Sequence, residues 1–273
     1  MEIEFVKTNP TQNMTVLVES PVERALHRTA ASRLMDYGSV YAEQVGYIER
    51  PSDRRAWARL QMAGGEFCGN AAMSLAAYLV WQRKLPEGED VSVPLEASGA
   101  DGLVGCLVRA EENHFTVSLS MPLPEDIGPM MLPAGGSRRE FAVVRLPGIT
   151  HVMVPRGSFG GDMTAGAERA AKEWADEIDA EAFGIILLDE KSCSIDPLVC
   201  VKPSGTLVWE RGCGSGSAAV GAYMAHRASR SMTSSVSQPG GVITVRAEYA
   251  GGRVTSLSIT GAVKIAARGT AYI

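Results

Sequence analysis

The chain has 273 residues, a formal net charge of −5 at pH 7 and 45% hydrophobic residues, which indicates a globular protein with one large or two medium domains. A mildly acidic balance without any basic block argues against nucleic acid as a partner. The opening MEIEFVKTNP lacks the basic-then-apolar pattern of a signal peptide, and no run is apolar for long enough to cross a bilayer. We therefore expect a cytoplasmic protein without a membrane partner.

The first half of the chain predicts strands, one amphipathic helix and one core helix. Alternating and β-branched runs place strands near Glu2–Lys7, Met14–Glu19, Ser39–Ile48, Val91–Leu95, Gly102–Arg109 and Phe115–Ser120, and the two helices at Val22–Met35 and from Cys68 to about Lys84. The stretch Pro122–Ser137 is rich in proline, glycine and methionine and has little periodicity. It predicts a linker.

The second half predicts the same order of elements. Strands are expected at Glu140–Arg145, His151–Val154, Phe183–Leu188, Asp196–Lys202 and Thr206–Glu210, helices at Thr164–Ile178 and Ser215–Ser229, and three further strands after Pro239–Gly241. This order favours an α+β fold with mainly antiparallel pairing. We expect two domains, residues 1–125, to which about 263–273 return, and residues 126–262.

Two stretches place a cysteine after glycines and at the start of an alanine-rich helix. GGEFCGNAAMSLAAYLVW contains Cys68, and WERGCGSGSAAVGAYMAHR contains Cys213. An Ala-Tyr pair follows each cysteine at nine and ten residues, and VRAE recurs beyond each helix. The chain therefore predicts two copies of one unit.

The start of a helix favours negative charge, because its first N–H groups have no intrahelical partner and the peptide dipoles add positive potential. A cysteine placed there is expected to have a lowered pKa. If the two units face each other, backbone N–H groups hold a substrate carboxylate while a thiolate removes the Cα proton and a thiol returns one to the opposite face. The pattern predicts inversion of an amino acid, with Cys68 and Cys213 exchanging the roles of base and acid.

Other readings of these residue types are weaker. The chain has five cysteines without a CxxC pair and four scattered histidines, so we predict neither a disulfide framework nor a metal site. Gly212–Gly216 imitates a nucleotide-binding loop but lacks the GK[ST] of a phosphate loop. The remaining cysteines lie in apolar, strand-like surroundings and are expected to be small buried side chains: Cys106, Cys193 and Cys200.

CGN at Cys68–Asn70 and CGSG at Cys213–Gly216 resemble the paired signatures of the diaminopimelate epimerase superfamily of cofactor-independent amino-acid racemases. The likeness covers nearly the whole chain: NPTQNMTVLVES resembles the family's first hairpin, and AEQVGYIE resembles a strand with an Asp-Gln pair. The combination of NMTxLV, EQVG, GGEFCGNA, WExxCGSG and a terminal GxAYI is similar to the histidine racemases that supply D-histidine for opine-type metallophores such as staphylopine.

The resemblance implies two pseudo-symmetric domains of the diaminopimelate epimerase-like fold, each a mainly antiparallel sheet around a core helix, with the active site in the cleft between them. It implies a small-molecule amino-acid substrate, no cofactor and a homodimer. Cys68 and Cys213 are then catalytic, and Glu43 contacts the amino group or imidazole of the substrate. The substrate-binding residues that it implies are Asn13, Glu43, Gln44, Gly69, Asn70, Glu210, Arg211, Gly214 and Ser215.

Three departures from the epimerase pattern bear on the substrate. Gly148–His151 lacks the family's asparagine, a second expected asparagine falls near Ala182 or Phe183, and Glu210–Arg211 almost abuts the second cysteine. Without these groups the distal end of diaminopimelate would be a buried, unpaired zwitterion, at a cost of several kcal/mol. Histidine is therefore the preferred substrate. The alternatives are diaminopimelate or another amino acid, and, from a different class, a non-catalytic amino-acid-binding module. His151 is open as an acid or base or as a structural histidine.

Overall fold

The computed structural model describes residues 1–273, except for the side chain of Ser204. The chain divides into two compact units: unit 1 consists of residues 1–121 and 259–273, and unit 2 of residues 122–258. Both contain strands and helices, so the predicted α+β class is confirmed. Among the described residues, no helix has the length and apolar character needed to span a membrane.

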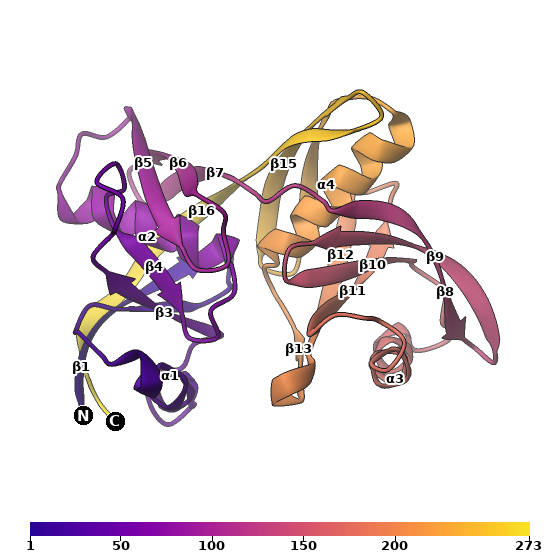
Figure 1. Ribbon diagram of the computed structural model, residues 1–273, viewed down its shortest axis with the longest axis horizontal. Helices are drawn as coiled ribbons and strands as arrows, with labels where there is room; N and C mark the ends of the chain where they lie inside the picture. The colour runs from indigo at the N-terminus through magenta and orange to yellow at the C-terminus, as the bar shows by residue number, and fades with distance from the viewer. The chain divides into compact units, whose positions relative to one another are not determined.

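Unit 1 is a sheet that closes on itself around one helix (Figure 1). The strands follow the order β1-β2-β3-β4-β5-β6-β7-β16, and β1 also pairs with β16. The elements are β1 (Glu2–Pro10), β2 (Thr15–Val18), η1 (Arg24–Leu26), α1 (His27–Met35), β3 (Gln44–Glu49), β4 (Arg59–Met62), α2 (Gly69–Gln82), β5 (Asp90–Ala97), β6 (Leu103–Ala110), β7 (Phe115–Ser120) and the end of β16 (Arg253–Tyr272).

Helix α2 is apolar on every side because strands surround it. All of its residues from Gly69 to Val80 are buried, and it packs against each strand from β1 to β7. A helix with no polar face is stable only in such a surrounding. Its alanines let the strands approach closely, and its first turn is thereby held in a fixed place within unit 1.

Unit 2 is an open sheet on which the helices α3 and α4 pack. The strand order is β16-β15-β14-β12-β11-β10-β9-β8, and β13 pairs with β12. The core contains Trp174 and Phe183, both fully buried. The elements are β8 (Asp126–Ala134), β9 (Ser137–Leu146), β10 (Ile149–Pro155), α3 (Met163–Trp174), β11 (Ala182–Asp189), β12 (Ser194–Val201), η2 (Lys202–Ser204), β13 (Thr206–Trp209), α4 (Gly214–Ala228), β14 (Met232–Gln238), β15 (Gly241–Ala250) and the start of β16.

Each unit contains two parallel strand pairs, β2–β3 and β4–β5 in unit 1 and β10–β11 and β12–β14 in unit 2, and the first pair of each unit lies next to site residues. In unit 1, β2 and β3 flank α1 in the chain, and Thr15 pairs with Gln44. In unit 2, β10 and β11 flank α3, and His151 pairs with Gly184. Most of the other pairings are antiparallel, as predicted. The pairs β2–β3 and β10–β11 supply polar groups to the regions around the two helix starts.

Two predictions about elements are wrong. The predicted linker Pro122–Ser137 contains a nine-residue strand, β8, which lies at the end of the strand order. An edge strand tolerates Pro129 because a backbone N–H on its open side would have no partner strand to bind, so the sheet loses no hydrogen bond there. Beyond Pro239–Gly241 the chain forms two strands rather than three, because β16 continues over 20 residues.

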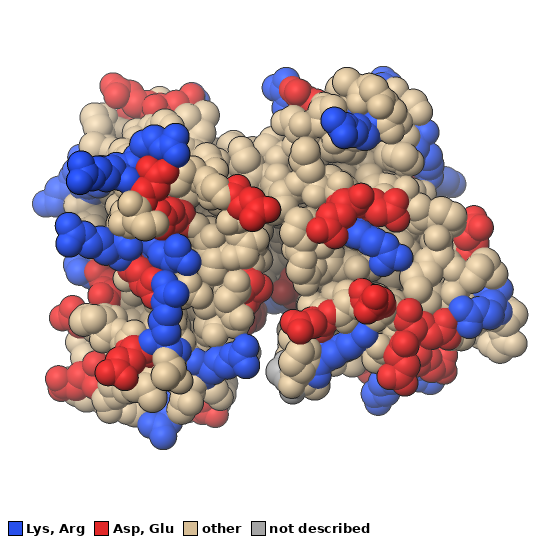
Figure 2. Space-filling view, viewed as in Figure 1, with Lys and Arg blue, Asp and Glu red and all other residues tan. Residues whose placement is uncertain are grey.

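The visible face in Figure 2 carries acidic and basic side chains close to one another on both units. Arg24 with Glu49, Arg138 with Glu177 and other such pairs form exposed or half-exposed ion pairs. On this face the basic side chains do not merge into one continuous surface of the kind that binds nucleic acid.

Candidate active site

Cys68 lies at the start of α2 as its N-cap residue, with extended backbone angles of φ −130° and ψ 110°. Its sulfur accepts a hydrogen bond from the N–H of Ala71 at 3.5 Å. This is one of the N–H groups that a helix start leaves without an intrahelical partner. The thiol therefore lies at the helix start, as the sequence predicts.

A fixed amide faces the Cys68 thiol. The side-chain nitrogen of Gln44 donates to Oδ1 of Asn13 at 2.6 Å and to Oγ1 of Thr15 at 2.8 Å. The Thr15 hydroxyl donates its hydrogen to the carbonyl of Asn13 at 3.1 Å, so toward Gln44 it can only accept. This fixes the orientation of the Gln44 amide, whose Oε1 accepts from the Cys68 thiol at 2.8 Å. Three of the predicted site residues, Asn13, Gln44 and Cys68, are thus brought together.

Glu43 and Asn70 lie beside this group. The carboxylate of Glu43 accepts a hydrogen bond from the N–H of Met14, and the N–H of Glu43 donates to the carbonyl of Met14 at 2.8 Å. The carboxylate is thereby held next to Asn13 in the chain. Asn70 is buried in the first turn of α2, after Gly69.

Cys213 repeats this construction in unit 2. It is the N-cap residue of α4 with φ −109° and ψ 105°, and its sulfur accepts from the N–H of Gly216 at 3.2 Å. The N–H of Cys213 donates to Oε1 of Gln238 at 2.7 Å. A Cβ at Gly216 would lie 3.0 Å from the Cys213 sulfur and 2.9 Å from Cδ1 of Ile186. Glycine is required there because a side chain would displace the thiol.

A hydroxyl and an imidazole lie next to the Cys213 sulfur. Oγ of Ser215 is 3.6 Å from that sulfur and 3.0 Å from Nε2 of His151. His151 is fully buried, and burial lowers its pKa to about 3. The imidazole is therefore neutral at physiological pH, which excludes it as a proton donor in the imidazolium form.

The predicted lowering of the Cys213 pKa is wrong. Burial raises the pKa of this thiol well above its usual value, and the negative charge of Glu210 raises it further. Hydrogen bonds from Ser215 and from the N–H of Gly216 act in the opposite direction. Because only 2% of Cys213 is exposed, lost hydration outweighs the helix start.

The other cysteines differ from one another in burial. Cys106 is buried, as predicted, and burial raises its pKa to about 12. Cys193 and Cys200 are half-buried rather than buried, and desolvation raises the pKa of both. All five cysteines are free thiols. Among the described residues, no cluster of three or more His, Cys, Asp or Glu side chains could hold a metal ion.

The neighbouring residues Glu210 and Arg211 have different contacts. Glu210 acts on the Cys213 thiol through its charge and a hydrogen bond. The guanidinium of Arg211 donates to the carbonyl of Pro239 at 3.4 Å, and the carbonyl of Arg211 accepts from the N–H of Gly240. Arg211 thus braces the turn before β15, and its contact with substrate stays a prediction.

Three contributors were not predicted from the sequence. Thr15 fixes the Gln44 amide, Gln238 holds the backbone of Cys213, and Gly184 provides the space for His151. Thr15 lies within the NMTxLV motif, but that motif does not predict its contact with Gln44, and Gln238 and Gly184 belong to no motif named above. Thr15 lies opposite Gln44, and Gly184 lies opposite His151, in parallel strand pairs. This register is known only from the structure.

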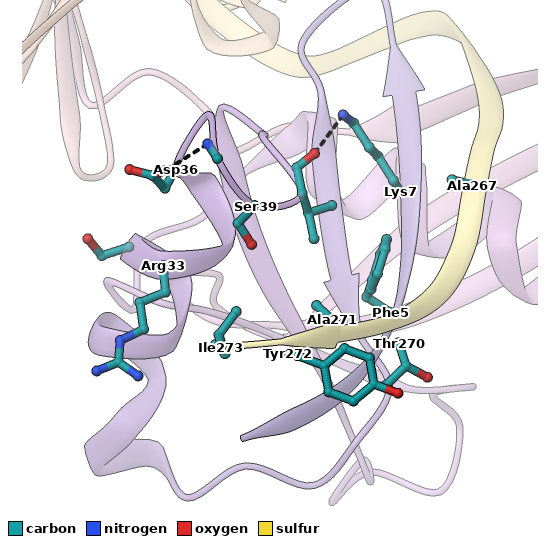
Figure 3. Close-up of a pocket in the computed structure, with 13 residues that line it drawn as sticks. Phe5, Lys7, Arg33, Asp36, Ser39, Ala267, Thr270, Ala271, Tyr272 and Ile273 are labelled. Atoms are coloured by element: carbon teal, nitrogen blue, oxygen red, sulfur yellow. Dashed lines mark hydrogen bonds between the residues drawn. The ribbon is translucent and has the colours of Figure 1, made fainter.

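A surface cavity of about 910 Å³ in unit 1 is separate from these residues (Figure 3). It lies between α1, β1 and the end of β16, where Lys7 donates to the carbonyl of Val40 at 3.0 Å. Its lining includes none of the site residues predicted from the sequence.

Comparison with known proteins gives matches along the whole chain. The model of the family described as the histidine racemase CntK N-terminal domain matches residues 2–272. A histidine racemase of Staphylococcus aureus is 30% identical over 99% of this chain and 98% of its own length. A histidine racemase of Fusobacterium nucleatum is 28% identical over 99% of this chain and 97% of its own length.

Solved structures with the same fold include racemases and epimerases. A hydroxyproline epimerase from Agrobacterium vitis, with bound trans-4-hydroxy-L-proline, has a TM-score of 0.70 and 14% identity, covering 98% of this chain and 92% of that one. A predicted epimerase from Pseudomonas aeruginosa has a TM-score of 0.69 and 14% identity, with 98% of each chain covered. At this identity the likeness establishes the fold.

Proposed function

This chain belongs to the histidine racemase family and is an isomerase, and we propose on that basis that it interconverts L- and D-histidine without a cofactor. The observation that carries the proposal is the family match over residues 2–272, which includes both cysteine-capped helices. The local geometry around each cysteine supports it.

We assign the substrate carboxylate to the starts of α2 and α4. Both helices begin directly after a cysteine, and their first-turn N–H groups concentrate positive potential there. When the Cα proton leaves, negative charge spreads onto the carboxylate oxygens, and backbone donors that are already in place stabilise this charge.

The two thiols transfer the protons. One cysteine, as thiolate, takes the Cα proton and becomes a thiol, while the other, as thiol, gives its proton to the opposite face of Cα and becomes a thiolate. The reverse reaction exchanges these roles, so one residue type serves both directions. The resting state of Cys213 is a thiol, because burial raises its pKa. It is therefore ready as the acid and has to lose its proton before it acts as the base.

Glu43 is assigned to the amino group or the imidazole of histidine. Its carboxylate is held by the N–H of Met14, close to Asn13 and Gln44. We expect Glu43→Gln, which keeps the shape and removes the charge, to raise KM or lower kcat for histidine. Steady-state kinetics by chiral chromatography measure this, and an unchanged rate of D-histidine formation would refute the role of Glu43.

The pathway that the sequence resemblance supports is the supply of D-histidine to an opine-type metallophore. This part of the proposal rests on the shared motifs NMTxLV, EQVG and WExxCGSG. Loss of metallophore after deletion of the coding sequence, with recovery on addition of D-histidine, is the expected result. Unchanged metallophore production in the deletion strain would contradict it.

The racemase proposal is tested by proton exchange. In this test the protein is to be incubated with L-histidine in deuterated water without pyridoxal phosphate. NMR follows the Cα proton, and chromatography follows the chirality of histidine. Deuterium should enter Cα as D-histidine forms. Cys200→Ser, which alters a half-buried cysteine away from both helix starts, is the matched control and should keep the wild-type rate.

The same assay separates the alternatives. Exchange confined to diaminopimelate, or to another amino acid, would assign the activity to that substrate instead. A protein that binds amino acids and exchanges none of their Cα protons would be a binding module, and the racemase proposal would be wrong.

A further inference from the structure

The two helix-capping cysteines meet different groups. The Cys68 thiol faces Oε1 of Gln44, an oxygen that accepts hydrogen bonds and donates none. The Cys213 sulfur faces the hydroxyl of Ser215, which both donates and accepts. At the helix position of Ser215, two residues after the cysteine, unit 1 has Asn70. The repeat therefore gives two similar backbones with different chemistry around each sulfur.

The parallel strand pairs account for this difference. In unit 1, Gln44 of β3 extends its amide to Cys68. In unit 2, the strand β11 has Gly184 opposite His151, and the imidazole takes the space over the glycine. A Cβ on Gly184 would lie 2.3 Å from Nδ1 of His151. The imidazole is thus fixed between β11 and the start of α4.

The burial of His151 determines which ring nitrogen carries the proton. Its Nδ1 is buried and has no hydrogen-bond partner among the described residues, while Nε2 lies 3.0 Å from Oγ of Ser215. Buried N–H groups without an acceptor are rarer than unused lone pairs. The proton therefore resides on Nε2 and is donated to Ser215. The hydroxyl hydrogen of Ser215 is then not used by the imidazole and can be donated to the Cys213 sulfur, 3.6 Å from Oγ.

We infer that His151 is a positioning residue, whose Nε2–H holds the Ser215 hydroxyl so that it donates to the Cys213 sulfur when this cysteine is a thiolate. The inference rests on the proposed racemase function, in which Cys213 has to give up its proton. It assigns no substrate contact to His151. The hydrogen bond from Ser215 counters the charge of Glu210, the acidic group that acts on this sulfur from the chain before α4.

The neutral state of His151 suits this role. An imidazole that titrated near neutral pH would change between one N–H donor and two N–H donors. This change would alter the direction of the Ser215 hydroxyl. Burial removes that change, since the pKa of His151 is lowered to about 3. The donor thus stays the same over the pH range in which the thiols act.

Two amide substitutions at His151 give a matched pair. In His151→Gln the amide nitrogen reaches about as far as Nε2, and in His151→Asn it reaches only about as far as Nδ1. Loss of the hydrogen bond raises the pKa of Cys213. At a pH below that pKa, a rise of about one pKa unit reduces the thiolate fraction about tenfold, and kcat/KM falls with it. We expect this loss, carried by kcat, in His151→Asn and in Ser215→Ala, and a rate within about threefold of wild type in His151→Gln.

A second measurement does not depend on turnover. In protein labelled with ¹⁵N-histidine, His151 should remain neutral with the proton on Nε2 between about pH 5 and pH 9, and its Nε2–H signal should shift in Ser215→Ala. A proton on Nδ1, or equal kcat/KM in the Gln and Asn variants, would overturn the inference. An inactive wild type would instead refute the racemase proposal, and the NMR result would still decide the tautomer. If His151→Asn did not fold, the kcat/KM of Ser215→Ala would test the kinetic prediction.

Discussion

At Gly184 the backbone of β11 lies directly against an imidazole. A Cβ there would meet Nδ1 of His151 at 2.3 Å and Cε1 at 2.8 Å, and His151 is fully buried. We expect Gly184→Ala to lower the free energy of unfolding by about 1–3 kcal/mol, because one of the two strands has to move. Urea denaturation followed by circular dichroism measures the change.

The matched control for this prediction is another strand glycine. At Gly105 the nearest atom to an added Cβ is Oγ of Ser120 at 3.7 Å, an ordinary contact. Gly105→Ala should leave stability unchanged or slightly higher, since alanine reduces the entropy of the unfolded chain. Equal losses in both variants would show that the contact between Gly184 and His151 is not tight.

The capping cysteines should each be indispensable for turnover. Serine can still accept a hydrogen bond at a helix start, but its hydroxyl is a far weaker acid than a thiol. We expect Cys68→Ser and Cys213→Ser each to reduce Cα exchange about 10²- to 10⁴-fold, the usual contribution of general acid–base catalysis. Single-turnover exchange in deuterated water gives the rates. A near-normal rate in either variant would rule out the two-thiol mechanism.

At the scale of elements, Glu96 of β5 joins the loop before β4 to the sheet. Its carboxylate accepts from the N–H of Asp53 and from the hydroxyl of Ser52 at 2.8 Å, and it pairs with Arg59 at 3.3 Å. These contacts lower the pKa of Glu96 to about 2. Because the pKa is lower in the folded state, its contribution to stability is present above the unfolded-state value, about 4.5, and is lost as the pH falls toward 2.

We expect Glu96→Gln to flatten this part of the acid profile. The variant should be less stable than wild type near neutral pH, and the difference should shrink between about pH 4.5 and pH 2. Urea unfolding at several pH values measures it. Glu87 is a control in the loop before β5, since it is exposed, and Glu87→Gln should leave the profile of the wild type intact. A difference that stays constant with pH would contradict the role of the Glu96 carboxylate.

The elements that the sequence predicted well are those whose pattern is local. The strand Phe115–Ser120 is β7, and the alanine-rich stretch after Cys68 is α2, which ends at Gln82. β8 was missed because its prolines are acceptable only at a sheet edge, a position that depends on the whole strand order. The long strand β16 was divided into pieces for the same reason, since its continuity comes from pairing with strands distant in sequence.

The same distinction applies to the site. Cys68 and Cys213 are recognisable because the glycines and alanines around them predict the start of a helix. Both residues are N-caps in the structure. The contact between His151 and Ser215 depends on the register of β10 on β11, which no local pattern encodes. The predicted lowering of the Cys213 pKa is wrong because burial, and not the helix start, dominates that pKa.

At the scale of the whole molecule, unit 1 is discontinuous in sequence and unit 2 is continuous. The ring of strands around α2 includes residues 259–273, which come after all of unit 2. Without them β1 loses its partner β16, and the ring has two open edges. Unit 2 uses residues 122–258 only.

We therefore expect residues 122–258 to fold when expressed alone, with a cooperative thermal transition. Residues 1–121 alone should not fold, because β1 and β7 both lose their partner β16, and Ile259 and Gly261 no longer pack near Gly69 and Met73 of α2. The control is residues 1–121 fused through a short flexible linker to residues 259–273, which should fold. A cooperative transition of residues 1–121 without the last strand would contradict the role of β16 in unit 1.

The burial of Cys213 also bears on how the protein withstands air and peroxide. Oxidants attack thiolates far faster than thiols, and exposed thiolates fastest. The Cys213 sulfur, which is 2% exposed and protonated at rest, is therefore protected from oxidation to a sulfenic or sulfinic acid. The same protection extends to Cys106. Cys68 is only half-buried, so if the proposed two-thiol reaction is right, oxidative loss of activity should begin at Cys68 and not at Cys213.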